Sequence, residues 1–177
     1  MSDYPLAYFI TWRTYGSWLP GDPRGWLKNR RGFQPPNPDL HVRALLACRE
    51  PPLVLNLLQR EVVEATIQQH CRIRRWPLHA KRCLSNHVHV VVSALTDPDT
   101  VMSQLKAWCT RRLHELQRRI GGSVRSQWWA ERGNKRKIYD LESLARAIYY
   151  VEQAQDGSAR PEVPAERHGP DLRDAAH

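Results

Sequence analysis

The segment Asn86-His87-Val88-His89-Val90-Val91-Val92 has the period-two alternation of a β-strand and lies in the middle of the chain. Successive side chains of a strand point to opposite faces, so both histidines leave one face and alternate valines leave the other. The valine face predicts burial against helices. Two imidazoles side by side can share one metal ion if at least one more ligand comes from elsewhere in the fold. The segment therefore predicts a core face and a candidate metal site on one strand.

Three interpretations of the histidine pair are open at this point. A zinc site would need His79 or Cys83 from the neighbouring strand as a further ligand. A magnesium or manganese site would instead use phosphate oxygens of a substrate together with the two histidines. The third interpretation is two ordinary histidines on a half-exposed strand. The pattern alone does not decide between them.

The segments on both sides of this strand predict an α+β fold with a mainly antiparallel sheet. Strands are predicted at residues 6–12, 76–84, 87–93, 127–129 and 136–139, and helices at residues 40–48, 57–73, 100–119 and 141–155. We expect one catalytic domain over residues 1–157, which includes a loop-rich insertion at residues 28–52. Residues 158–177 are polar and contain prolines, so we expect a disordered tail.

The composition predicts a basic, soluble protein. Its 177 residues are 41% hydrophobic, and the formal net charge of +9 favours a polyanionic partner, nucleic acid first. No apolar run approaches the roughly 20 residues of a membrane span. The N-terminus has no basic region followed by an apolar stretch, so we expect a cytoplasmic protein. The four cysteines are widely spaced, which argues against a zinc ribbon and against a disulfide scaffold.

The predicted last helix, residues 141–155, carries two adjacent tyrosines. Its apolar residues at 3-4 spacing are Leu141, Leu144, Ala145, Ile148 and Val151. Tyr150 lies about 200° from Ile148 around an ideal helix, so it points away from this apolar side, whereas Tyr149 lies nearer to it. A tyrosine hydroxyl can attack a phosphodiester when a metal ion polarises the phosphoryl oxygen. Tyr150 is therefore either a boundary side chain or a candidate nucleophile.

Five segments occur in a fixed order along the chain. They are the first strand at residues 8–16, the histidine strand at 86–92, Lys-Ala-Trp at 106–108, Trp128-Trp129 with Arg132-Gly133, and the tyrosine segment at 150–155. This ordered set resembles the HUH single-tyrosine transposases, in the branch that includes REP-associated tyrosine transposases. The resemblance spans residues 4–157. It implies that His87 and His89 are metal ligands and that Tyr150 is the nucleophile.

The resemblance also implies a fold and an activity. The fold is a ferredoxin-like antiparallel sheet packed with helices, often in a homodimer. The cofactor is Mg²⁺ or Mn²⁺. The activity is nicking of single-stranded DNA near a hairpin, which gives a 5′-phosphotyrosine and a free 3′-OH, followed by rejoining.

The third metal ligand is where this sequence departs from the family. The family often has an amide side chain four residues after the tyrosine, and that position here is Ala154. Either Tyr150 acts with Gln155 beyond a distorted helix end, or Tyr149 acts with Gln153. We favour Tyr150 with Gln155, because Tyr149 is expected nearer the packed side of the helix.

Basic residues from three parts of the chain are predicted to contact DNA. They are Arg13, Lys106, Arg111, Arg112, Lys135, Arg136 and Lys137. Such residues neutralise phosphates, and binding then weakens steeply with salt. A solvated basic surface without a partner is an equally good interpretation for any one of them.

Three functions are compatible with these observations. The favoured one is a metal-dependent endonuclease and strand transferase that cleaves single-stranded DNA through a tyrosine. An inactive regulator of the same fold would bind hairpin DNA without cutting it. A zinc hydrolase ranks last, because no glutamate adjoins the histidines to act as a general base.

Overall fold

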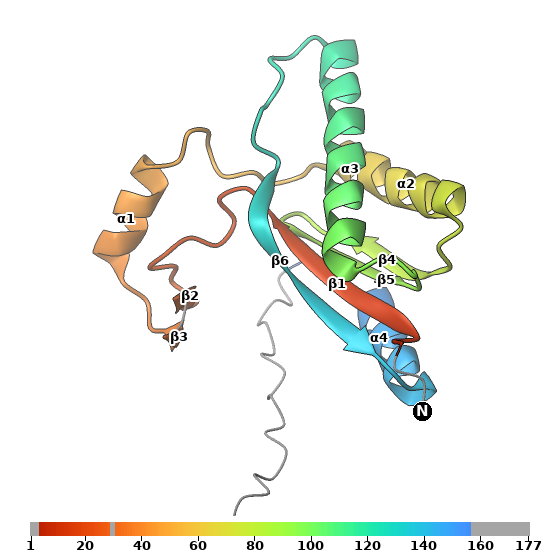
Figure 1. The fold of residues 1–177 in the computed structure, drawn as a ribbon. Coiled ribbons are helices and arrows are strands. Elements are labelled where there is room, and N and C mark those ends of the chain that lie inside the picture. Colours follow the sequence, from red (N-terminus) through yellow and green to blue (C-terminus); the bar gives the residue numbers. More distant parts are fainter. Residues whose placement is uncertain (1–3, 29–30, 157–177) are drawn as a thin grey trace, which may run out of the picture.

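The computed structural model describes residues 4–28 and 31–156, which form a four-stranded sheet with helices on both faces and a small separate hairpin (Figure 1). The elements are β1 (Ala7–Thr14), β2 (Trp26–Lys28), β3 (Gly32–Gln34), α1 (Pro38–Leu46), α2 (Leu57–Arg74), β4 (Leu78–Cys83), β5 (His87–Val92), α3 (Pro98–Ile120), β6 (Trp129–Ile138) and α4 (Leu141–Glu152). The predicted tail at residues 158–177 lies outside the described residues.

The main sheet has the strand order β4-β5-β1-β6, and all neighbouring strands are antiparallel. Along the chain these strands alternate with two helices in the order β1-α2-β4-β5-α3-β6. This connectivity with this strand order is the ferredoxin-like arrangement. The predicted α+β class with an antiparallel sheet is confirmed. None of the helices in the described part of the chain is long and apolar enough to cross a membrane.

The two faces of the sheet are covered by different helices. The larger apolar cluster joins the even-numbered valines of β5 to α2 and α3, and it includes the fully buried Ile10 and Trp12 of β1. The smaller cluster joins Val91 and Ile138 to α4 on the opposite face. The prediction that the valine face packs against helices is therefore confirmed. The histidines share the α4 face, because side chains alternate along β5.

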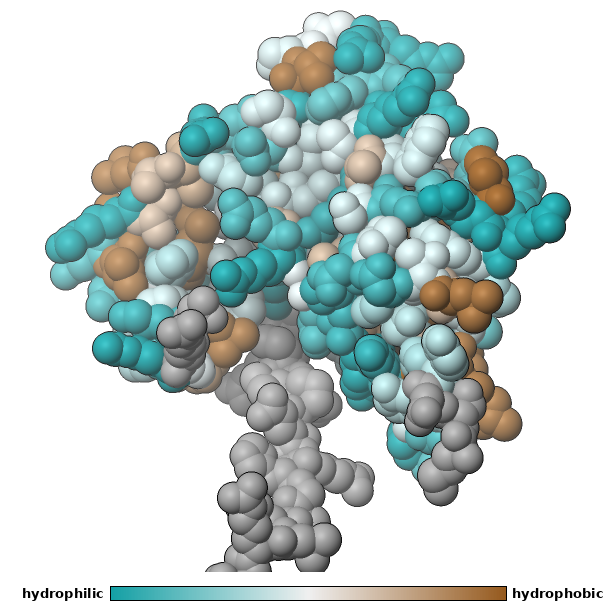
Figure 2. Space-filling model, viewed as in Figure 1, coloured by the Kyte–Doolittle hydropathy of each residue, from teal (hydrophilic) through white to brown (hydrophobic). Residues whose placement is uncertain are grey.

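The insertion between β1 and α2 forms a separate lobe. It contains the hairpin β2–β3 and the helix α1, where the sequence predicted a loop-rich insertion at residues 28–52 and a helix at residues 40–48. No residue of α1 is buried. Figure 2 shows hydrophobic residues at the surface of this lobe, where Val42, Leu45 and Leu46 of α1 are exposed.

The strand β6 differs from its prediction. The sequence predicted two short strands around a turn at residues 131–134, whereas β6 is a single strand of ten residues. Gly133 lies within this strand and pairs with Trp12 of β1. A Cβ atom at Gly133 would lie 2.6 Å from the carbonyl oxygen of Thr11 and 2.5 Å from the sulfur of Met102. The glycine is needed for close packing of α3 on the sheet.

Candidate functional site

The two histidines of β5 lie side by side on the face that α4 covers. Their ring centroids are 4.6 Å apart and the ring planes are nearly perpendicular, at 83°. Both side chains are buried, His87 with 5% and His89 with 6% of its surface exposed. The structure therefore brings the predicted pair together in a site largely shielded from solvent.

A neighbouring oxygen fixes each imidazole at Nδ1. The Oδ1 atom of Asn86 lies 2.6 Å from Nδ1 of His87, and the Oγ1 atom of Thr11 lies 2.9 Å from Nδ1 of His89. An amide oxygen only accepts hydrogen bonds, so Nδ1 of His87 donates and its Nε2 carries a lone pair. Metal-binding histidines are commonly oriented in this way, with one ring nitrogen donating to an oxygen. The donor set thus fits a divalent metal bound through the two Nε2 atoms.

The surroundings also keep both rings neutral. Burial lowers the pKa of His87 to about 4, and the nearby charge of Arg13 acts in the same direction. Burial lowers the pKa of His89 to about 3, with further contributions from His87 and Arg13. Neutral imidazoles are the form that binds a metal ion. At neutral pH neither ring carries a second proton that a metal would have to displace.

The tyrosine of α4 that lies against this pair is Tyr150. Its ring centroid is 5.6 Å from that of His89 and 5.8 Å from that of Phe9. Nearly half of the side chain, 47%, stays exposed, compared with 67% for Tyr149. Ring contacts with the histidines are found for Tyr150 and not for Tyr149 within the described residues.

This placement corrects the predicted packing of the last helix. Leu141 and Ala145 were expected on the buried side but are exposed, and Ala147 is buried with Val151 instead. This shift turns the helix so that Tyr150 lies at the edge of the packed side, one helical turn after Ala147. The expectation that Tyr149 is nearer the packed side is wrong.

The predicted third ligand lies beyond the end of the helix. The helix α4 ends at Glu152, with Gln153 as its C-cap, so Gln155 belongs to the chain that follows. Gln153 and Gln155 are both exposed. Gln155 lines a polar cavity of about 370 Å³ at the end of β4, next to Arg82. A role for either glutamine as a ligand stays a prediction.

Asp156, which the sequence analysis missed, ties this segment to the histidine strand. Its Oδ1 accepts a hydrogen bond of 2.7 Å from the backbone N–H of Ser85, and its Oδ2 lies 2.6 Å from Nη1 of Arg60. Ser85 directly precedes Asn86, the partner of His87. The chain after the tyrosine helix is thereby anchored to the turn that orients the first histidine.

The zinc interpretation does not fit this geometry. Cys83 belongs to the apolar cluster on the opposite face of the sheet, and burial raises the pKa of its thiol to about 12. The Nε2 atom of His79 lies 2.8 Å from Oγ of Ser93. Within the described residues, no three His, Cys, Asp or Glu side chains gather as a metal site. The prediction that Cys83 completes a zinc site is wrong.

The predicted DNA-contacting residues are divided between the two faces of the sheet. Arg13 is the cross-strand partner of His87, and Arg136 is the partner of Phe9 with its guanidinium 5.5 Å from that ring. Directly paired residues share a face, so both arginines lie on the histidine face. Arg82, the partner of His89, lies there too and was not among the predicted contacts.

The other predicted contacts lie on the opposite face or on α3. Lys135 forms an ion pair with Asp99 of α3. The ammonium of Lys106 donates to backbone carbonyls of β6, at 2.8 Å from that of Ala130, and burial lowers its pKa to about 8. Arg111 and Arg112 pair with Glu115 on the same helix. These residues therefore do not form one surface with Arg13 and Arg136.

No protein-family model matches this sequence, and no curated protein matches it. The chain is similar to a solved structure described as a candidate transposase from Deinococcus radiodurans R1. The TM-score is 0.50 at 14% sequence identity, over 85% of this chain and 92% of that chain. A REP-associated tyrosine transposase bound to a REP hairpin gives a TM-score of 0.46 at 15% identity, over 85% of this chain and 70% of that chain. The first similarity shows a shared fold.

Proposed function

We propose that this protein is a divalent-metal-dependent endonuclease and strand transferase of the transposase type, which acts on single-stranded DNA through Tyr150. The observation that carries the proposal is the contact between the Tyr150 ring and His89, beside a second buried, neutral histidine. A potential nucleophile and two metal-ligating nitrogens thus meet on one face of the sheet. The shared fold with a protein described as a candidate transposase agrees with this proposal.

The chain supplies a set of nitrogen ligands for Mg²⁺ or Mn²⁺. His87 and His89 would hold the ion through Nε2, since their Nδ1 atoms are engaged by Asn86 and Thr11. Gln155 is the proposed third ligand. When bound, the ion would polarise a phosphoryl oxygen of the scissile phosphodiester.

The tyrosine carries out the covalent step. The Oη atom of Tyr150 attacks the phosphorus, and its proton passes to water, which can reach this partly exposed side chain. The bond between phosphorus and the 3′ oxygen breaks, and that oxygen takes up a proton from water. The products are a 5′-phosphotyrosine and a free 3′-OH. Attack of a 3′-OH on the phosphotyrosine rejoins a strand and releases the tyrosine.

The DNA strand would cross the histidine face. Arg13, Arg82 and Arg136 are the basic residues placed on this face by their cross-strand partners. A hairpin substrate and a homodimer are the remaining parts of the proposal, and both rest on the sequence resemblance.

The test uses labelled single-stranded hairpins drawn from the DNA that flanks the gene, with Mn²⁺ or with EDTA. We expect a covalent protein–DNA adduct on denaturing gels in Mn²⁺ and none in EDTA. The adduct should be lost in Tyr150→Phe and retained in Tyr149→Phe, which is the matched control because it removes the neighbouring hydroxyl. Hairpin binding without any adduct, unchanged by Tyr150→Phe, would instead identify an inactive hairpin-binding regulator.

A further inference from the structure

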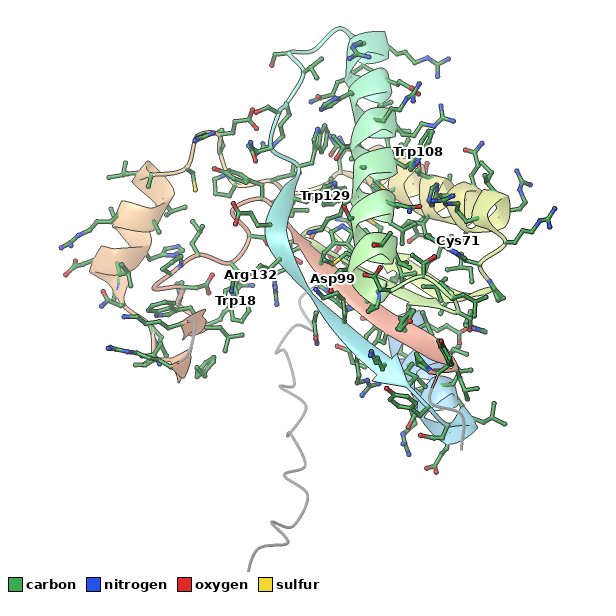
Figure 3. All side chains as sticks on the ribbon, in the orientation of Figure 1. Trp18, Cys71, Asp99, Trp108, Trp129 and Arg132 are labelled. Atoms are coloured by element: carbon green, nitrogen blue, oxygen red, sulfur yellow. The ribbon has the colours of Figure 1, made fainter. Side chains whose placement is uncertain are left out.

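Arg13 occupies an unusual position for a residue that only attracts DNA. It is half-buried on β1, directly opposite His87, on the histidine face. Its guanidinium carbon lies 4.6 Å from the centre of the Trp18 ring, which is a stacking distance for a cation on an aromatic face. Figure 3 shows Trp18 in the segment that follows β1, beside the sheet.

One nitrogen of this guanidinium lacks a hydrogen-bond partner among the described residues. Nη1 of Arg13 is buried and finds no hydrogen-bond partner within the described residues. No Asp or Glu of these residues forms an ion pair with Arg13 either. A buried charged donor without an acceptor is costly, so such a group is usually satisfied by a ligand or an ion.

The loop that carries Trp18 is built to hold its ring in place. Nε1 of Trp18 donates a hydrogen bond of 2.7 Å to the carbonyl of Gly25. Arg24 donates to the carbonyl of Ser17 at 2.8 Å and forms a two-pronged ion pair with Asp22, which is buried. The stacked guanidinium therefore has a fixed orientation.

Arg13 lies beside the groups of the proposed active site. It is the direct cross-strand partner of His87, whose ring centroid is 4.6 Å from that of His89.

We propose that Arg13 is a catalytic residue that binds a non-bridging oxygen of the scissile phosphate through Nη1, and that Trp18 is the positioning residue that aligns its guanidinium. This inference rests on the proposed function. A planar guanidinium offers directed N–H groups to a phosphate, which the point charge of lysine does not. Arg13 would stabilise the negative charge on the phosphoryl oxygens while Tyr150 attacks.

The first test measures single-turnover adduct formation and hairpin affinity side by side. Arg13→Lys keeps the positive charge but removes the planar guanidinium and its directed N–H groups, so we expect the rate of adduct formation to fall about 100-fold. The Kd for the hairpin should change by no more than about twofold. Arg118→Lys is the matched control, since Arg118 is exposed in the last turn of α3, and its rate should stay within about twofold of the wild type.

Variants of Trp18 test its positioning role. Trp18→Leu removes the aromatic face, and we expect a rate loss of about tenfold, with Trp18→Phe restoring most of the rate. Rates for Arg13→Lys close to the wild type would overturn the proposal. A rate loss matched by an equal loss of hairpin affinity would overturn it as well, because Arg13 would then serve general attraction.

A second readout does not depend on catalysis. In the Tyr150→Phe protein, the arginine Nε–H signals are recorded by NMR, and the Arg13 signal is assigned by its absence in Arg13→Lys. Inorganic phosphate at millimolar concentration should shift the Arg13 signal, and no such shift would overturn the phosphate site. This shift, together with no adduct from the wild-type protein on any hairpin, would support the anion site while rejecting the proposed function.

Discussion

The two faces of β5 differ in what covers them, although both are buried. Val88 and Val90 have no exposed surface, and they pack against apolar side chains of α2 and α3. His87 and His89 are almost as buried, but their neighbours include an amide, a hydroxyl, a guanidinium and a phenol. Burial alone therefore does not separate core from site. The polarity of the neighbouring groups separates them. Mutations on the valine face should mainly lower stability, and mutations on the histidine face should mainly lower activity.

The largest effect is expected on the helix-covered face. Trp12→Ala removes a fully buried indole, and we expect a loss of about 3–5 kcal/mol in the free energy of unfolding. Urea unfolding followed by circular dichroism measures this loss. Phe9→Ala, on the histidine face and only half-buried, should cost less. Equal losses would mean that both faces contribute alike to stability.

Neighbouring residues of β5 give the sharpest test of the contrast. His89→Ala should lower the rate of adduct formation by at least about 100-fold, because a proposed metal ligand is lost. Val90→Ala should cost about 2 kcal/mol of stability through lost burial and a cavity, with adduct formation retained. Unfolding curves measure the stability of both variants, and single-turnover assays measure their rates of adduct formation. A His89→Ala protein that unfolds before Val90→Ala would contradict the division between the faces.

A smaller effect is expected at the residue that orients the first histidine. Asn86→Ala removes the oxygen bound to Nδ1 of His87, and we expect Mn²⁺ affinity to fall about 10–100-fold. Isothermal titration of the protein with Mn²⁺ measures the change. Ser85→Ala is the control, since Ser85 contributes its backbone N–H to this turn. Unchanged Mn²⁺ affinity in Asn86→Ala would show that the hydrogen bond does not support a metal site.

The smallest effect distinguishes two adjacent residues of β6. Arg136 lies on the histidine face, and Lys137 points to the opposite face as the partner of Tyr8. Arg136→Gln should weaken hairpin binding and reduce the salt slope of log Kd by about 0.7, as for one phosphate contact on a single strand. Lys137→Gln should leave the slope unchanged. Fluorescence anisotropy over a range of salt concentrations measures both, and equal slopes would place the DNA elsewhere.

The sequence predicted the elements whose signals are local. Alternation along residues 87–92 is enough to predict a strand and to put both histidines on one side. Helix α2 was predicted from the periodicity of its apolar residues, within one residue of its observed end at Arg74. These features depend on side chains close together in the chain, which a pattern can capture.

The rest depends on contacts between distant segments. The role of Gly133 follows from the approach of Met102, and the position of Tyr150 follows from how α4 packs on β4 and β5. Lys135, Arg136 and Lys137 were all predicted to contact DNA, because the sequence does not tell which face of β6 each residue occupies. Trp18 and Asp156 carry no motif, and only the fold brings Trp18 to Arg13 and Asp156 to the turn before His87.

The strand order has a consequence for how the protein is made. The central strand β1 is synthesised first, but both of its partners, β5 and β6, come much later in the chain. On the ribosome β1 must therefore wait unpaired, since pairing between distant segments is slow and closes only when the partner has emerged. The histidines can reach their place on the sheet before Tyr150 has been translated. Tyr150 and Gln155, the proposed nucleophile and the proposed third ligand, are thus the last parts of the candidate site to emerge, after the whole sheet has been translated.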